Sequence, residues 1–125
     1  MVLKMLKGKI HRARITRCDI DYEGSLEIDP EIMEKAGILP YEKILVVNAT
    51  NGERLETYAI AGKAGSKVFC LNGAAARKGS VGDVIIVMCF ADLTEAEAAS
   101  FRPRVVVLDE KNNVVACRLG KEEIS

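Results

Sequence analysis

The chain has 125 residues, 49% of them hydrophobic and only 5% aromatic, and its 18 basic and 18 acidic side chains give a formal net charge of zero. This length predicts one domain with an aliphatic core. Neutral charge gives no support for a nucleic-acid or membrane partner, and no apolar run reaches the roughly 18 residues of a membrane span. No signal peptide is visible, so we expect a cytoplasmic protein.

The chain has few candidate metal ligands. Its cysteines, Cys18, Cys70, Cys89 and Cys117, show no C-x-x-C spacing, and His11 is the one histidine. Tetrahedral metal sites need clusters of such ligands, so we expect no metal. Four cysteines could form disulfides, but nothing in the sequence indicates an oxidising compartment.

The first predicted element is a strand over residues 9–18. Its alternation divides the side chains into two faces, Lys9, His11, Ala13 and Ile15 against Ile10, Arg12, Arg14 and Thr16. Lys9 and His11 therefore point the same way, a cation beside an imidazole. A basic pair of this kind is more commonly part of a solvated edge.

The segment Tyr22-Glu23-Gly24-Ser25 follows this strand and carries the most informative dipeptide. In a strained peptide, the Ser25 hydroxyl can attack the unhindered Gly24 carbonyl and move the acyl group from nitrogen to oxygen. Elimination and hydrolysis then leave a pyruvoyl group at residue 25 and a new C-terminus at Gly24. A pyruvoyl ketone condenses with amines and acts as an electron sink. Taken alone, Gly-Ser indicates only a turn.

A short helix is predicted next, because Asp29 can cap its start, Pro30 suits its first position and Gly37 can end it. Residues 43–49 and 54–61 read as strands, and Asn51-Gly52 between them predicts a hairpin.

On the second hairpin strand, alternation places Arg54 and Tyr58 on one face. A guanidinium and a phenol so spaced can converge on one small anion, although a surface cross-strand pair is the commoner arrangement. Thr57 faces the other way on an ideal strand. A site that uses all three side chains therefore requires a bend or twist.

Residues 67–71 are predicted to form a strand that leads into Asn72-Gly73-Ala74-Ala75. Small side chains let a ligand approach the backbone N–H groups, as in anion-binding nests. A tight turn into one helical turn is the alternative.

The second half of the chain continues this pattern of strands and turns. Residues 84–90 form the most apolar run and are the predicted central strand, and the Thr-Glu-Ala-Glu sequence at 94–97 predicts a capped helix that ends at Ser100. Residues 105–108 and 114–119 are predicted to form a last hairpin, followed by a frayed tail over 121–125. Many short strands, tight turns and two short helices predict an all-β barrel.

Four motifs, at matching order and spacing over about residues 5–103, resemble the aspartate 1-decarboxylase family: Lys9-x-His11, Tyr22-Glu23-Gly24-Ser25, Asn51-Gly52-x-Arg54-x-x-Thr57-Tyr58-Ala59-Ile60, and Asn72-Gly73-Ala74-Ala75. The resemblance implies a single double-psi β-barrel domain over 1–125, self-processed into 1–24 and 25–125 and assembled as a homotetramer. It implies a lyase that converts L-aspartate to β-alanine and carbon dioxide for pantothenate synthesis. The implied cofactor is a covalent pyruvoyl group derived from Ser25, without metal or PLP. Residues 105–125 match no such pattern.

The resemblance also implies roles for individual residues. Ser25, as the pyruvoyl group, would condense with the substrate amine and accept electrons when the α-carboxylate departs. Tyr58 would return a proton to the carbanion carbon. Thr57 would hydrogen-bond the Gly24 carbonyl during processing.

Substrate binding is assigned by the resemblance to Lys9, Arg54, Thr57, Asn72, Gly73, Ala74 and Ala75. Arg54 would hold a carboxylate bidentately, with Lys9 adding positive potential. His11 and Tyr22 would line the same pocket. Because a small barrel filled with Val and Ile has no room for a polar pocket, we expect the site outside the core, at a subunit interface.

Two other functions remain open. The first is a small β-barrel module that binds nucleic acid through residues 1–17, which hold basic but no acidic side chains. Neutral net charge and the lack of an aromatic stacking platform count against it. The second is a pyruvoyl decarboxylase for another amino acid or for a phospholipid head group. A lipid substrate would require an apolar membrane-facing segment, and none is visible.

Overall fold

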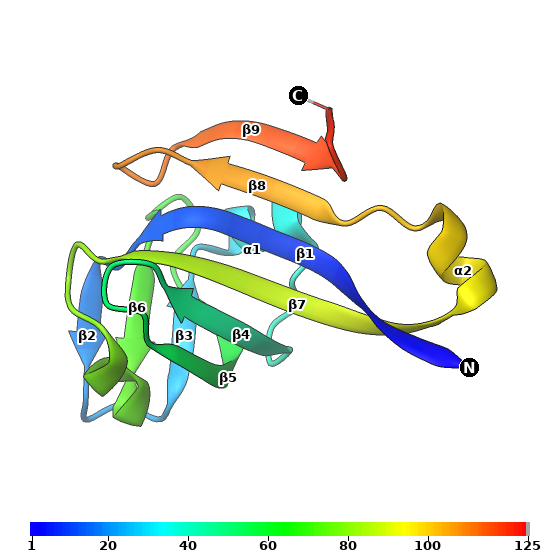
Figure 1. The fold of residues 1–125 in the computed structure, drawn as a ribbon. Helices are drawn as coiled ribbons and strands as arrows, with labels where there is room; N and C mark the ends of the chain where they lie inside the picture. The colour runs from blue at the N-terminus through cyan, green and yellow to red at the C-terminus, as the bar shows by residue number, and fades with distance from the viewer. Residues whose placement is uncertain (125) are drawn as a thin grey trace.

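The structure, a computed structural model, describes residues 1–124 and is built mainly of strands (Figure 1). The strands are β1 (Val2–Arg14), β2 (Arg17–Asp19), β3 (Ser25–Ile28), β4 (Lys43–Asn48), β5 (Arg54–Ala61), β6 (Phe69–Asn72), β7 (Val84–Thr94), β8 (Arg104–Leu108), β9 (Val114–Leu119) and β10 (Glu122–Glu123). The helices are α1 (Pro30–Ala36), the 3₁₀ helix η1 (Gly73–Lys78) and α2 (Glu95–Ser100).

The strands follow the order β10-β9-β8-β1-β7-β4-β5-β3-β6-β2, and the sheet closes because β1 runs almost directly into β2. Thr16, in the short connection, donates its backbone N–H to the Phe69 carbonyl at 2.8 Å and accepts from the Phe69 N–H on its side-chain oxygen at 3.0 Å. We call the closed part of the sheet, from β1 through β7, β4, β5, β3 and β6 to β2, the ring. Two of its strand pairs, β2–β6 and β3–β5, are parallel. The all-β barrel expected from the sequence is confirmed.

Aliphatic side chains fill the barrel. Ile10, Val87 and Val46 stand in one row across β1, β7 and β4, and all three are fully buried. Burial of each such side chain contributes about 1.5–3 kcal/mol. Because alternate residues point outward, Leu45, Val47, Ile86 and Met88 lie half-buried on the outer face of β4 and β7.

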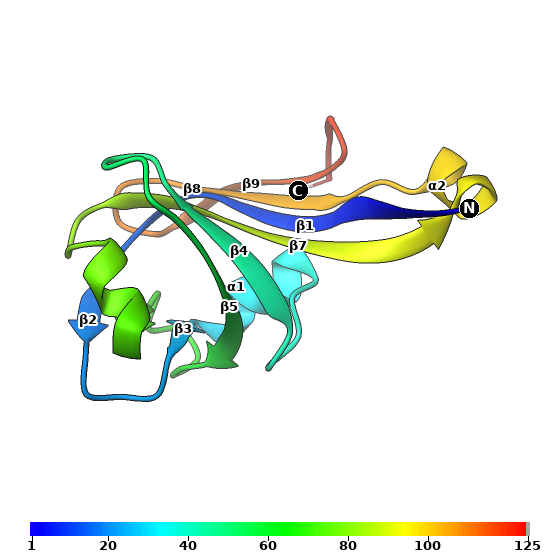
Figure 2. The ribbon, with the colours of Figure 1, turned by 60° about the horizontal axis from the view of Figure 1, so that its bottom comes forward.

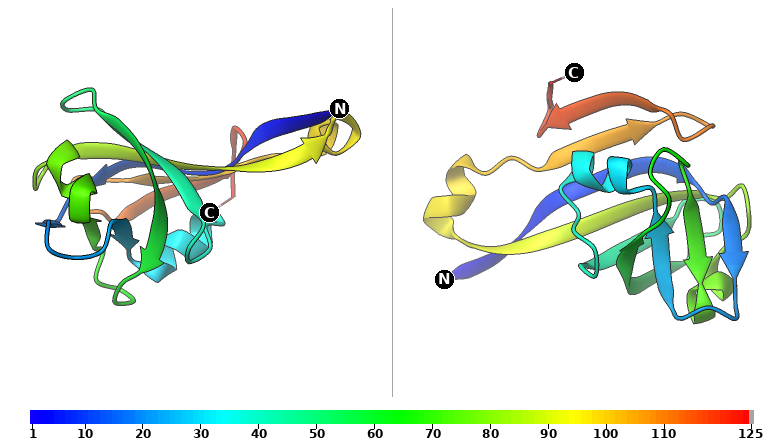
Figure 3. Two further views of the ribbon diagram at one scale, coloured as in Figure 1. Left: turned by 90° about the horizontal axis from the view of Figure 1, so that it is seen from below. Right: turned by 180° about the vertical axis from the view of Figure 1, so that it is seen from behind.

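Part of the molecule lies outside the barrel. The first half of β1 and the second half of β7 remain paired beyond the ring, from Leu6–Phe90 out to Val2–Thr94, and extend toward α2 (Figure 3). Figure 2 shows α1 packed beneath this ribbon, close to β8. No helix among residues 1–124 is long and apolar enough to cross a membrane.

The prediction for the first strand was wrong in two respects. β1 begins at Val2 instead of residue 9 and ends at Arg14, with β2 as a separate element. A register shift between Ile10 and Ala13, where Arg12 has a φ of 67°, breaks the alternation. Simple alternation predicted that Ile10 and Ala13 face opposite sides of the strand. The bulge turns Ala13 inward, so both residues point into the core.

Most other local predictions are confirmed. The Asp29 carboxylate accepts from the Glu31 N–H at 2.9 Å at the start of α1, and Gly37 ends that helix in the left-handed conformation. Thr94 and Glu97 form the expected capping box of α2. The β4–β5 and β8–β9 hairpins pair as expected, and β7 is paired on both sides but extends to Thr94.

The prediction for the C-terminal tail was wrong over part of its length. Glu122–Glu123 forms β10 and pairs with β9, because the chain reverses at Gly120, where φ is 60°. Ser125, also in the predicted tail, lies outside the described residues.

Candidate active site

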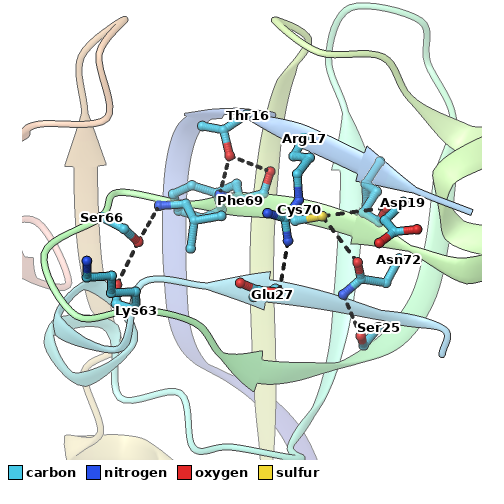
Figure 4. Close-up of polar contacts among 12 residues, drawn as sticks. Thr16, Arg17, Asp19, Ser25, Glu27, Lys63, Ser66, Phe69, Cys70 and Asn72 are labelled. Carbon is cyan, nitrogen blue, oxygen red and sulfur yellow. Dashed lines mark hydrogen bonds and ion pairs between the residues drawn. The ribbon is translucent and has the colours of Figure 1, made fainter. Parts of the chain in front are cut away.

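Ser25 is the first residue of β3 and is almost fully buried. It pairs with Asn72, the last residue of β6, across an antiparallel ladder. The Asn72 side-chain amide donates to Ser25 Oγ at 3.0 Å (Figure 4). The Ser25 hydroxyl in turn donates to the Glu23 carbonyl at 3.2 Å. Both hydrogen bonds fix the hydroxyl immediately beside the Gly24–Ser25 peptide.

The two sides of Gly24 differ. On one side Gly24 is open, since a Cβ added to it would find only the Asn72 carbonyl oxygen, 4.0 Å away. On the other side, η1 begins with Gly73 at a φ of +63°, with its backbone directly against Gly24. The backbone at Gly24 is therefore packed against η1 on one side and leaves open space beside its Cα on the other.

Tyr58 lies beside Ser25 because β3 and β5 run parallel. Leu26 pairs with Ala59, so Ser25 and Tyr58 each stand one residue earlier on adjacent strands. Both line a pocket of about 280 Å³, whose wall consists of Tyr22, Glu23, Ser25, Pro40, Tyr41, Tyr58, Ile60 and Ala61. Two expected site residues, Tyr22 and Tyr58, thus share a cavity with the serine.

Thr57 has a different position. It is half-buried and lines a second pocket of about 650 Å³, together with Tyr41, Lys43, Glu56 and Tyr58. Among the described residues it makes no hydrogen bond to Gly24. Tyr41 and Tyr58 line both pockets, whereas Thr57 lines only the larger one.

The expected cations lie elsewhere on the same chain. Lys9 pairs with Met88, and Arg54 pairs with Val47, on the outer face of the barrel. Neither these residues nor His11 line the pocket of Ser25. A single chain therefore brings together Ser25, Tyr58, Tyr22 and the start of η1, but not Lys9, His11 and Arg54.

His11 has an unusual electrostatic environment. Burial, and then the positive charges of Lys9, Arg12 and Arg118, lower the pKa of its imidazole below the ordinary value of 6.5. Its Nδ1 atom is buried without a hydrogen-bond partner within the described part of the chain. His11 is therefore neutral at pH 7. No group of three or more His, Cys, Asp or Glu side chains in residues 1–124 is arranged to hold a metal ion.

Comparisons with known proteins agree with this site. Residues 1–115 match the family described as Aspartate decarboxylase. A relative from Syntrophobacter fumaroxidans is 60% identical over 108 residues, which cover 86% of this chain and 87% of the relative. Relatives from Salinibacter ruber and Pelotomaculum thermopropionicum are 53% and 51% identical over 118 and 121 residues, which cover 94% and 97% of this chain and 81% and 92% of theirs. All three carry the name Aspartate 1-decarboxylase.

The chain belongs to the aspartate decarboxylase family.

Membership confirms the family expected from the four sequence motifs, and with it an enzyme of the carboxy-lyase class. The match reaches residue 115, beyond the end at about residue 103 that the motifs gave.

Two residues near the site of this decarboxylase were missed from the sequence. Tyr41 lines both pockets with a φ of 70°, and its ring centroid lies 6.4 Å from that of Tyr58. No sequence signal marks Tyr41. Cys70 donates its thiol hydrogen to Asn72 Oδ1 at 3.1 Å. That residue could have been found, because residues two apart on a strand share a face.

Proposed function

We propose that this chain converts L-aspartate to β-alanine and carbon dioxide, in the supply of pantothenate, through a covalent pyruvoyl group made from Ser25. The observation that carries the proposal is the buried Ser25 hydroxyl, hydrogen-bonded by Asn72 beside Gly24, in a member of this family. The relatives' names supply the substrate. A cytoplasmic location fits such biosynthetic chemistry. The proposed reaction requires neither nucleic acid nor a membrane.

Self-cleavage follows from the position of the Ser25 hydroxyl. Its Oγ bonds to the Gly24 carbonyl carbon, the C–N bond breaks, and the hydroxyl proton passes to the released nitrogen. The ester then eliminates: the Cα proton leaves to water, the Cβ–Oγ bond breaks, and its electron pair remains on the Gly24 carboxylate. Hydrolysis of the resulting unsaturated amine consumes one water and releases ammonia. Thr57 is the proposed donor to the oxyanion at Gly24, which requires its pocket to open toward that carbonyl.

The residues around Ser25 fit a pyruvoyl group. The position is buried, touches the Asn72 amide and opens into a cavity that also holds Tyr58. When formed, the group supplies an electron sink for a substrate amine. Tyr58 would deliver the proton that replaces carbon dioxide on the substrate. Asn72 and the backbone of Gly73, Ala74 and Ala75 would orient the substrate carboxylates from the side of η1.

A second copy of the chain would complete the site. Lys9, Arg54 and His11 lie on the outer face of the barrel, away from the chain's own serine pocket. Between them runs the half-buried apolar surface of β4 and β7, the kind of surface that oligomers bury. We propose a homotetramer in which these side chains reach the pocket of a neighbouring subunit. The test is to measure turnover and the sedimentation coefficient on the same sample. Full turnover by a chain that sediments as a stable monomer would contradict this assembly.

An intact-mass spectrum of denatured protein tests the central proposal. Mature protein should show fragments 1–24 and 25–125, and the larger fragment should lack a free amine at its first residue. Reduction in the presence of L-aspartate should add mass to the larger fragment only, and Ser25→Ala should remain uncut. Active protein that runs as one uncut chain would overturn the proposal.

A further inference from the structure

The side chain of Cys70 lies beside Asn72, one row along the sheet from the cleavage site. On the outer face of β2, β6 and β3, the strand register forms two neighbouring rows, Arg17–Cys70–Glu27 and Asp19–Asn72–Ser25 (Figure 4). Cys70 and Asn72 are two residues apart on β6, and their side chains meet. The thiol is thus one contact away from the reactive hydroxyl.

The contacts form a chain of donors that runs in one direction. The fully buried Cys70 thiol donates to Asn72 Oδ1 at 3.1 Å, and Asn72 Nδ2 donates to Ser25 Oγ at 3.0 Å. The Ser25 hydroxyl then donates to the Glu23 carbonyl at 3.2 Å. Asn72 and Ser25 each accept one hydrogen bond and donate the next, so the orientation of one group fixes that of the next, and the Glu23 carbonyl ends the series.

The thiol selects one of two orientations of the Asn72 amide. A carboxamide can rotate by half a turn and exchange its oxygen and its NH₂ group. If Asn72 were turned round, its NH₂ group would face the thiol and Oδ1 would face Ser25. The Ser25 hydroxyl would then donate to Asn72, and Oγ would lose the N–H that it now accepts.

The Arg17–Glu27 ion pair covers this thiol. The guanidinium of Arg17 lies 3.6 Å from the Glu27 carboxylate, in the row that contains Cys70 between them. Contact with the Cys70 thiol, ahead of the charge of Glu27, raises the pKa of the Arg17 guanidinium. The pair shields the thiol from water, which would otherwise compete for Asn72 Oδ1.

We infer that Cys70 is a positioning residue for self-cleavage, whose thiol holds Asn72 in the orientation that donates to Ser25 Oγ. The inference rests on the proposed cleavage at Gly24–Ser25. During elimination, Oγ carries the electron pair of the breaking Cβ–Oγ bond, and an N–H donor at this atom stabilises the charge that develops there. Cys70 acts on this step only through Asn72. Because Oγ leaves with the Gly24 carboxylate, the contact between Asn72 and Oγ is absent once the pyruvoyl group has formed, and loss of the thiol should affect cleavage more than turnover.

The test compares three substitutions at Cys70. Cys70→Ser keeps a donor, whereas Cys70→Ala and Cys70→Val remove it, and valine also preserves side-chain bulk. Freshly made precursor is followed by intact mass to give a cleavage rate, and kcat is then measured per trapped pyruvoyl group. We expect cleavage in the serine variant to be within about threefold of wild type, and cleavage in the alanine and valine variants to be slower by roughly tenfold, the effect of one hydrogen bond. The kcat per pyruvoyl group should change less than the cleavage rate.

Cys89→Ala is the matched control, because Cys89 is equally buried but lies on β7, outside these rows. It should lower the thermal midpoint without slowing cleavage. Wild-type cleavage rates in both Cys70→Ala and Cys70→Val would overturn the inference, as would a serine variant as slow as they are. Failure of the proposed function looks different, since wild type itself would then stay uncut.

Discussion

Gly73 and Gly24 lie with their backbones in direct contact: a Cβ atom on Gly73 would stand 2.7 Å from the Gly24 amide nitrogen and 2.8 Å from its Cα. Real side chains do not approach backbone atoms this closely. The start of η1 thus packs against the backbone that leads into the Gly24–Ser25 peptide, and only glycine permits an approach this close.

Replacing Gly73 by alanine should therefore impair cleavage. Gly73→Ala adds a methyl group against the backbone of Gly24 at a φ of +63°, so the backbone that leads into the cleaved peptide must shift. We expect at least a tenfold slower cleavage, measured by intact mass. Gly52→Ala is the control, because Gly52 has a φ of +79° but open space around it. It should lose about 1–2 kcal/mol of stability from strain and cleave normally. Equal cleavage in the two variants would show that the contact is unimportant.

Substitutions at Thr57 and at Tyr58 should affect different steps, the first self-cleavage and the second turnover. Thr57→Val removes the proposed oxyanion donor, and loss of one such donor typically slows a reaction about a hundredfold. Tyr58→Phe should cleave normally, since only the proton donor is lost, while turnover falls by roughly 10²–10⁴. Intact mass and a decarboxylation assay on the same samples separate the two effects. A Thr57→Val chain that cleaves at the normal rate, or an uncleaved Tyr58→Phe chain, would refute the assignment.

Truncation of Tyr41 should lower turnover, and the alanine and glycine variants should differ in stability. Its ring packs near Tyr58, and aromatic pairs contribute about 0.5–1.5 kcal/mol, so Tyr41→Ala and Tyr41→Gly should each lower kcat/KM by roughly twofold to tenfold. Glycine tolerates the φ of 70° and should give a higher thermal midpoint than alanine. Tyr41→Phe keeps the ring and should retain activity. Equal activity in the Tyr41→Phe and Tyr41→Ala variants would show that the Tyr41 ring does not contribute to turnover.

His11 should make stability depend on pH in a defined window. Burial and neighbouring cations lower its pKa in the folded chain, whereas the unfolded chain keeps a value near 6.5. As the pH falls below 6.5, the unfolded state binds a proton before the folded state does, so stability decreases until the folded pKa is reached. His11→Gln should lack this decrease in thermal midpoint. Because His11 is the only histidine, its NMR titration gives the folded pKa directly, and a value above 6.5 would contradict the prediction.

Local signals in the sequence were sufficient for elements that depend on neighbouring residues. Asp29 and Gly37 bound α1, and Thr94 with Glu97 caps α2, because capping involves atoms only a few residues apart. The bulge at Arg12 could not be predicted in this way. It arises because β1 must pair with β7 and also lead into β2, and both constraints come from distant parts of the chain.

The candidate site shows the same division. The family motifs indicated Ser25, Tyr58 and Asn72, and the structure brings these three together. The motifs contain no information on Tyr41, which reaches the pocket only because its N–H donates to the Ala59 carbonyl at 2.7 Å and ties a loop to β5. In the proposed assembly Lys9 and Arg54 reach Ser25 of a neighbouring chain, and no strand pattern within one chain specifies how two chains pack together.

The strands on either side of the cleavage site are both bound to β6, β2 in parallel and β3 in antiparallel. A break between residues 24 and 25 would therefore leave every strand in place, with β1 and β2 retained as a separate peptide. The loss of the covalent link would therefore matter mainly in the unfolded state, where no strand pairing holds the two pieces together. An uncut chain can refold by itself, at a rate independent of dilution, whereas the two cut pieces must first find each other. Cleavage would thus make unfolding hard to reverse in dilute solution. The mature enzyme could refold only as fast as its two pieces associate, although its uncut precursor folded as a single chain.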